Sequence, residues 1–161
     1  MIILGIDPGT ARLGYGVIRK TKSKKNKLKA IDYGCIETSS DLSDGERLKK
    51  INNELNKLIK KQKPNVLAVE NVYFFKNLKT AITVSQAKGI ILLAAAKKKI
   101  PVYEFSPLEV KTVVSGYGRA SKKQIQRMVK YLLDIKKTFK SDDEADALGI
   151  AICGSLKIKR R

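Results

Sequence analysis

Apolar residues at the start of the chain fall into short blocks that are typical of β-strands. Segments 2–7 and 14–20 are mostly apolar and are joined by the turn-forming run PGTARL, and KAIDYGCIET at 29–38 forms a third block. Strands joined by short turns pair antiparallel, so we predict a meander of three antiparallel strands. Between the last two strands, residues 19–29 hold seven Lys or Arg in eleven positions. We expect a solvated hairpin loop there, although its charges could also touch a phosphate backbone.

A helical pattern follows at 43–63. Ser43 and Glu46 have the spacing of a capping box, in which each side chain bonds to the other residue's backbone amide. Apolar residues then recur every three or four positions, which places them on one face of a helix that ends before Pro64. These residues are Leu48, Ile51, Leu55, Leu58 and Ile59.

Beyond Pro64 the chain alternates between extended and helical segments. NVLAVE at 65–70 is continuously apolar, as in strands that are buried on both faces. A long helix is predicted over 78–96, followed by a strand at PVYEF, residues 101–105.

Three further helices are predicted from their starts. Each begins with a serine followed three residues later by Glu or Gln, which is the spacing of a capping box. The pairs are Ser106 with Glu109, Ser121 with Gln124, and Ser141 with Glu144. The helix after Ser121 is expected to bury one face, made of Ile125, Met128, Val129, Leu132 and Leu133. The last helix, which contains DEADALGIAICG, is rich in Ala and Gly and should lie tightly against the sheet.

The order of elements predicts an α/β fold. Three antiparallel strands followed by alternating helices and strands form a mixed five-stranded sheet with helices on both faces. At 161 residues the chain is one domain, 1–161, with a basic tail at about 157–161.

Charge changes this picture from an ordinary α/β domain to one with a polyanionic partner. The formal net charge is +19, which favours nucleic acid or, less directly, an acidic membrane surface. A general bias toward lysine is the alternative, and KTKSKKNKLK fits it. No run approaches the roughly 20 apolar residues of a membrane span, and no signal-peptide pattern is present. We therefore expect a cytoplasmic protein that does not associate with a membrane.

The residue types exclude several chemistries. The chain has no histidine and two cysteines, so Ser-His and Cys-His catalysis are excluded, and a structural zinc site lacks ligands. Cys35 and Cys153 lie in apolar stretches and are expected to be small core residues.

Four acidic residues stand in unusual positions. Asp7 and Glu70 each end an apolar strand, and Asp143 and Asp146 lie three apart on one face of the last helix. Each has an ordinary alternative: Asp7 could form the turn, Glu70 could reach solvent, and Asp143 could interact with the helix dipole. Asp146 is harder to explain, because its apolar neighbours predict a buried helix, and an uncompensated buried carboxylate is costly.

These four carboxylates would form one pocket if the two strand ends are adjacent and the last helix crosses them. Lys or Arg could neutralise such a pocket, but divalent cations do so more directly in a +19 protein. Ligands that are all oxygen favour Mg²⁺ or Mn²⁺. Two such ions can activate a water and stabilise the leaving oxygen in phosphoryl displacement. An acidic, metal-holding pocket on a basic surface is typical of a nuclease.

Five blocks along almost the whole chain resemble the RuvC family of bacterial Holliday-junction resolvases, which have an RNase H-like fold. They are ILGIDPGTARLGYGVI, AVENVYFFKN, QAKGIILLAAA, VKTVVSGYGRASKKQIQRMV and DEADALGIAI. The resemblance implies that Asp7, Glu70, Asp143 and Asp146 hold two Mg²⁺ ions, which Mn²⁺ can replace. GIDPGT alone also resembles the phosphate-binding turn of sugar kinases, actin and Hsp70.

The resemblance also implies DNA contacts. Tyr73 and Phe74 match the aromatic loop where family members place a Phe that wedges at the junction crossover, and which of the two does so stays open. Two core aromatics are the ordinary alternative. Lys111 and Lys122 match family lysines near the cleaved strand, although a solvated role is the default for a lysine in this chain. Weaker matches are Arg119 and Lys123 as auxiliary DNA contacts, and Thr10 and Gln86 as hydrogen-bonding residues beside the site.

The family's partners follow from the same resemblance. They are four-way junction DNA and a second copy of the chain, and the long helix at 78–96 could supply the dimer face. Docking of the branch-migration proteins RuvA and RuvB stays open. The alternative functions are an RNase H-like nuclease for RNA or another branched DNA, a catalytically idle junction-binding module, and an actin-like phosphotransferase.

Overall fold

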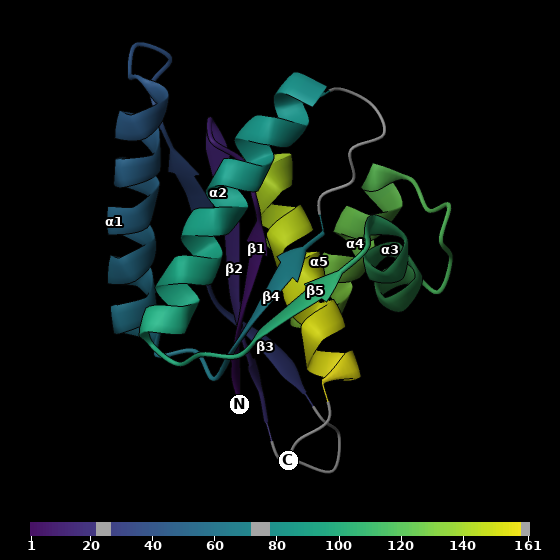
Figure 1. Ribbon diagram of the computed structural model, residues 1–161. Helices are drawn as coiled ribbons and strands as arrows, with labels where there is room; N and C mark the ends of the chain where they lie inside the picture. The colour runs from purple at the N-terminus through teal and green to yellow at the C-terminus, as the bar shows by residue number, and fades with distance from the viewer. Residues whose placement is uncertain (22–26, 72–77, 159–161) are drawn as a thin grey trace.

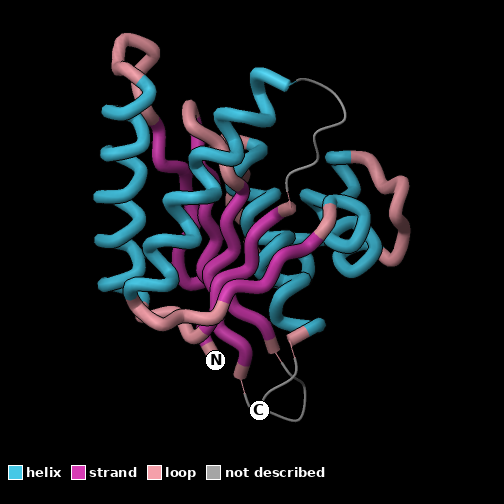
Figure 2. Tube along the Cα trace, viewed as in Figure 1, coloured by secondary structure: helices cyan, strands magenta, loops and turns pink. Residues whose placement is uncertain are grey.

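The computed structural model describes residues 1–21, 27–71 and 78–158 and contains a mixed five-stranded sheet. The strands are β1 (Ile2–Asp7), β2 (Arg12–Lys20), β3 (Leu28–Glu37), β4 (Val66–Glu70) and β5 (Val102–Phe105). Their order across the sheet is β3-β2-β1-β4-β5 (Figure 2). β2 pairs antiparallel with β1 and β3, whereas β4 pairs parallel with β1 and β5. The predicted sheet, with its antiparallel first three strands, is confirmed.

In the described part of the chain, five helices cover the two faces of this sheet (Figure 1). α1 (Asp44–Gln62) and α2 (Leu78–Lys97) lie on one face. α5 (Asp142–Lys157) lies on the other, with α3 (Pro107–Ser115) and α4 (Lys122–Leu133) packed beside it. Each layer encloses its own apolar core. Across the described residues, none of these helices is long and apolar enough to cross a membrane.

The basic segment at 19–29 is less of a loop than predicted. β2 continues through Lys20 and β3 begins at Leu28, so both ends of the segment belong to strands. The Thr21 amide donates to the Lys27 carbonyl at 3.1 Å, which closes the hairpin. Residues 22–26 lie outside the described residues. The predicted strands at 14–20 and 29–38 are therefore confirmed at these two ends to within one residue, and the strand pairing takes in the basic residues at both ends of the segment.

The helix starts follow the predicted capping boxes in three of four cases. The reciprocal bonds are present at Ser43 with Glu46, Ser106 with Glu109, and Ser121 with Gln124. The predicted faces are also buried, with Leu48, Met128 and Leu132 only half-buried at their margins.

The capping box predicted at Ser141 is wrong. Ser141 is the residue before α5, but its side chain makes no capping bond. Its hydroxyl instead lies 3.1 Å from the Cys35 sulfur on β3. Glu144 does not bond to the Ser141 amide; its Oε2 accepts a hydrogen bond from the amide of the preceding residue, Lys140, at 2.9 Å. Contact with the sheet thus replaces the local cap.

α5 lies directly on the sheet, as its small residues predicted. A Cβ added at Gly14 of β2 would collide with the Asp143 carbonyl, and one at Gly5 of β1 would collide with the Ala147 carbonyl. Cys153 in the middle of α5 is fully buried, as expected of a core residue, whereas Cys35 is only partly buried. The predicted basic tail begins inside this helix, because Lys157 ends α5 and Ile158 is buried. Glycines in the strands therefore set the distance between the sheet and the start of α5.

Candidate active site

Asp7 and Glu70 lie side by side at the carboxyl ends of two parallel strands. Ile6 of β1 pairs with Val69 of β4, and each acid is the next residue of its strand. Because side chains alternate along a strand, Asp7 points to the same face as Gly5, which is the face that α5 covers. The strand pairing therefore holds both carboxylates at one edge, beneath the last helix.

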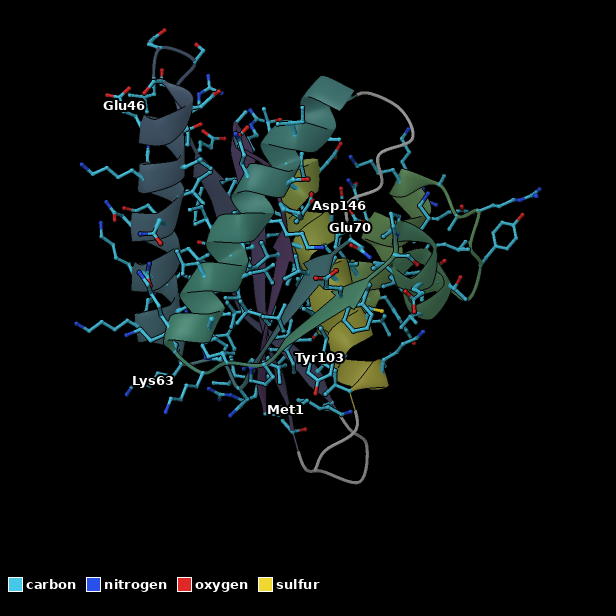
Figure 3. The ribbon with its side chains drawn as sticks, in the orientation of Figure 1. Met1, Glu46, Lys63, Glu70, Tyr103 and Asp146 are labelled. Carbon is cyan, nitrogen blue, oxygen red and sulfur yellow. The ribbon has the colours of Figure 1, made fainter. Side chains whose placement is uncertain are left out.

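The first turns of α5 bring the other two acids to this edge. Asp143 lies over Gly14, which is the strand partner of Asp7. Asp146 is three residues further on the same helical face, and its neighbours Ala145 and Ala147 are fully buried. Figure 3 shows Asp146 and Glu70 next to each other, where β4 ends in front of α5. The sheet and the helix together bring the four predicted acids to one place.

The electrostatics of the four acids show how closely they are grouped. Burial raises the pKa of Asp7 to about 7, and the charges of Glu70 and Asp146 add to the rise, followed by that of Asp143. Burial and then the charge of Asp146 raise the pKa of Glu70 to about 7 as well. The pKa of Asp146 is also raised, chiefly by burial. Half-buried carboxylates that repel one another in this way favour a cation between them.

Three basic side chains surround the acids. Lys122 at the start of α4 places its Nζ 3.0 Å from Asp142 and 3.5 Å from Asp146. The Lys111 charge on α3 opposes the rise in the pKa of Glu70. On the other side, a guanidinium nitrogen of Arg12 lies 3.9 Å from Asp143. Each cation thus neutralises part of the acidic cluster.

A cavity of about 220 Å³ opens between α3, α4 and the edge of the sheet. Its lining combines apolar walls with two acids and two lysines. The lining residues are Glu70, Pro107, Val110, Lys111, Lys122, Ile125 and Asp146. Two larger hollows of about 550 and 420 Å³ lie along α1 and include none of the four acids. The small cavity therefore belongs to the site.

The donor set suits a hard divalent cation, because all four side chains supply carboxylate oxygens. Within the described residues, however, no three acidic or thiol side chains are gathered closely enough to form a ready-made cation site. Asp146 faces Lys122, and the Oδ2 of Asp143 faces Arg12 and the Cys35 sulfur. Both carboxylates therefore already have a basic partner within the chain.

The remaining predicted residues fall into three groups. Tyr73 and Phe74 lie outside the described residues, so the wedge stays a prediction. The auxiliary cations Arg119 and Lys123 are exposed, in the α3–α4 connection and the first turn of α4. The Thr10 carbonyl accepts a hydrogen bond from the Thr38 hydroxyl at 2.6 Å, which ties the turn after β1 to the end of β3.

Gln86 was predicted to form a hydrogen bond beside the acids. It is exposed on the outer face of α2, in line with the exposed side chains of Ile82 and Leu93. Its predicted hydrogen bond beside the site stays a prediction.

Sequence reasoning missed Arg12, Asp142 and Cys35. Arg12 follows the turn after Asp7, and Asp142 directly precedes a predicted acid, so proximity in the sequence was a usable signal for both. The Cys35 sulfur lies 4.0 Å from Asp143 Oδ2. No local sequence pattern predicts that contact, because β3 and α5 are far apart in the sequence.

The chain is similar to known proteins over almost its whole length. A family model described as crossover junction endodeoxyribonuclease RuvC matches residues 3–154. A relative of that name from Halothermothrix orenii is 49% identical over 163 residues, which cover 100% of this chain and 97% of the relative. Another from Desulfitobacterium hafniense is 52% identical over 153 residues, which cover 95% of this chain and 91% of the relative.

Solved structures show the same likeness. The RuvC of Thermus thermophilus in complex with a Holliday junction substrate superposes with a TM-score of 0.89 at 32% identity, covering 96% of this chain and 93% of that one. The yeast mitochondrial Holliday junction resolvase shares the fold, with a TM-score of 0.65 at 17% identity, covering 95% of this chain and 78% of that one. These neighbours confirm the predicted RNase H-like architecture.

Proposed function

The chain belongs to the RuvC family of crossover junction endodeoxyribonucleases, and on that premise we propose that it resolves four-way DNA junctions in recombination and repair. It would do so by paired symmetric nicks that hydrolyse phosphodiester bonds. The observation that carries the proposal is the convergence of Asp7, Glu70, Asp143 and Asp146 at one edge of the sheet. A DNA-processing role also fits the net charge of +19 and the predicted cytoplasmic location.

The proposed chemistry depends on Mg²⁺, for which Mn²⁺ can substitute. Two ions held by the four carboxylates would activate a water and stabilise the leaving oxygen. Asp7 and Glu70 are the fixed part of this arrangement, because β1 and β4 hold them in a buried sheet. Asp143 and Asp146 are carried by α5, and its close contact with Gly5 and Gly14 limits their distance from the sheet.

The surrounding cations are proposed to hold the DNA backbone. Lys111 and Lys122 line the same cavity as Glu70 and Asp146, so a phosphate that they bind lies beside the acids. Arg119 and Lys123, which are exposed in the α3–α4 connection and the first turn of α4, are proposed to extend this basic surface. Phosphate contacts of this kind position the strand without reading its sequence.

A homodimer is proposed because paired nicks need two active sites. One face of α2 supports this proposal because it exposes apolar side chains that a second copy of the chain could cover. The side chain of Ile82 is 57% exposed and that of Leu93 is 47% exposed. Gly89 lies between them with open space where a Cβ would be, so another helix could approach closely. Docking of RuvA and RuvB stays a prediction.

The acids can be tested by separating binding from cutting. Asp7→Asn and Asp146→Asn remove a charge without changing side-chain size, so both variants are expected to bind a four-way junction and to lose cleavage in Mg²⁺. Asp134→Asn is the matched control, since Asp134 is exposed at the end of α4 and should cut normally. Normal cutting by either site variant would contradict the metal assignment.

A further inference from the structure

Two of the four acids already have a basic partner that comes from another element. The start of α4 supplies Lys122 to Asp146, and β2 supplies Arg12 to Asp143. Both basic side chains are more than half exposed, at 54% for Lys122 and 58% for Arg12. They therefore stand between the acids and the solvent from which DNA would approach.

We propose that Lys122 and Arg12 are built-in counterions, which hold Asp146 and Asp143 in the metal-free site and release them when DNA phosphates bind the two cations. On this view metal and junction bind cooperatively, and each raises the affinity of the site for the other. The inference rests on the proposed function, because it takes the four acids as metal ligands and DNA as the substrate.

Arg12 lies between two acidic side chains. It is the strand partner of Glu37, and its Nε lies 3.4 Å from the Glu37 carboxylate, so one side of the guanidinium faces β3. The other side faces Asp143 Oδ2 at 3.9 Å, and the Cys35 sulfur approaches the same oxygen at 4.0 Å. One oxygen of Asp143 is thereby directed toward β2 and β3. Of the three carboxylates whose charges raise the pKa of Asp7, that of Asp143 contributes least.

Lys122 is held in a similar way from the opposite side. Its Nζ lies between Asp142 at 3.0 Å and Asp146 at 3.5 Å. Asp142 is itself fixed, because its Oδ1 accepts a hydrogen bond from Gln126 at 2.7 Å. Asp142 thus keeps the ammonium at the mouth of the cavity, next to Asp146 and within reach of solvent.

Competition for charge couples the two binding events. A lysine or arginine that moves to a phosphate leaves its carboxylate unpaired, and an unpaired carboxylate in a partly buried cluster binds a cation more tightly. Linkage makes the effect reciprocal, so bound metal must raise the affinity for junction by the same factor. Exposed ion pairs are weak, which allows this exchange to occur readily.

Calorimetry with Ca²⁺ tests the inference, since Ca²⁺ shares the preference of Mg²⁺ for oxygen ligands. Its affinity is measured for free protein and for protein saturated with a four-way junction. For the unmodified chain we expect the junction to raise Ca²⁺ affinity by about 5-fold to 150-fold, the usual range of such coupling. Arg12→Gln and Lys122→Met should each bind Ca²⁺ several-fold more tightly without DNA and show a smaller gain with it.

Matched controls separate this effect from a general loss of positive charge. Arg19→Gln alters a residue on the same strand as Arg12 but at its far end, and Lys60→Met alters an exposed lysine of α1, which lies on the opposite face of the sheet from α5. Both are expected to behave as the unmodified chain. The two test variants alter exposed side chains on different elements, so each tests the inference if the other fails to fold.

The inference would be overturned if both test variants bound Ca²⁺ without DNA no more tightly than the unmodified chain does. It would also be overturned if the junction raised the Ca²⁺ affinity of both variants as much as it raises that of the unmodified chain. Cleavage of junctions by the unmodified chain in Mg²⁺ is scored separately. If it cuts and the coupling is missing, the inference fails while the proposed function stands. If it does not cut, the proposed function fails whatever the calorimetry shows.

Discussion

Replacing Asp7 with Asn should stabilise the metal-free fold while it removes cleavage. In the folded chain burial and the nearby acids raise the pKa of Asp7 to about 7 from its ordinary value of 3.8. The folded state therefore holds this proton more tightly than the unfolded state does. Ionising the carboxyl at pH 8 costs up to about 4 kcal/mol, at 1.36 kcal/mol for each unit between the two pKa values. Asn carries no charge and avoids that cost.

The sign of the pH dependence follows from the same pKa values. Since the folded state binds the extra proton, the free energy of unfolding falls as the pH rises from about 4 to about 7. Asp7→Asn should show a shallower fall. Relaxation and water at the site reduce the full cost, so we expect a gain of about 1–3 kcal/mol at pH 8 and little gain at pH 4.5.

Thermal melts in EDTA between pH 4.5 and 8 measure this difference. A gain of that size raises the melting temperature of a domain of this length by about 3–10 °C at pH 8. Asp134→Asn is the control, because Asp134 is exposed and its left-handed backbone suits Asn equally well. A melting temperature of Asp7→Asn that is equal to or below that of the unmodified chain at pH 8 would refute the electrostatic account of the site.

Other features of the fold and site give three further predictions. Gly14→Ala should lower the free energy of unfolding by about 2–3 kcal/mol in urea melts and impair cleavage, because its Cβ would collide with the first turn of α5. Gly45→Ala, where a Cβ meets nothing, should not destabilise the chain in this way. Leu93→Lys on α2 should yield a monomer in sedimentation and abolish paired nicking, and an unchanged dimer would exclude that face. Ser141→Ala should lower the melting temperature less than Ser43→Ala does, because only Ser43 makes a capping bond. Such a bond usually contributes about 0.5–2 kcal/mol to the free energy of unfolding.

Much of the fold could be predicted from the chain because local rules and global packing agree in it. The capping boxes at Ser43, Ser106 and Ser121 form as their spacing predicts, since both partners lie within one turn. The apolar blocks form the strands of the sheet, and the first three strands pair antiparallel as predicted. The start of β2 at Arg12 was missed because Arg12 and Leu13 belong to the turn-forming run PGTARL, and their strand character comes from pairing with Glu37 and Ile36 of β3.

The convergence of the four acids was predictable for a related reason. Parallel strands end at one edge of a sheet, and residues three apart lie on one face of a helix. What the sequence could not show is the partner of each acid. The Ser141 hydroxyl contacts Cys35 instead of capping α5, and Arg12 of β2 reaches Asp143 on α5. Such contacts depend on how closely α5 approaches the strands.

The nuclease assignment is tested most directly by mapping nicks on three synthetic substrates in Mg²⁺. They are a mobile four-way junction, a linear duplex and a flap, each labelled in turn on every strand. The proposed function predicts symmetric nicks in two opposing strands of the junction, with ends that ligase can seal, and no cuts in the duplex or the flap. Cutting of the flap or duplex at a comparable rate, or junction binding without nicks in Mg²⁺ or Mn²⁺, would contradict it.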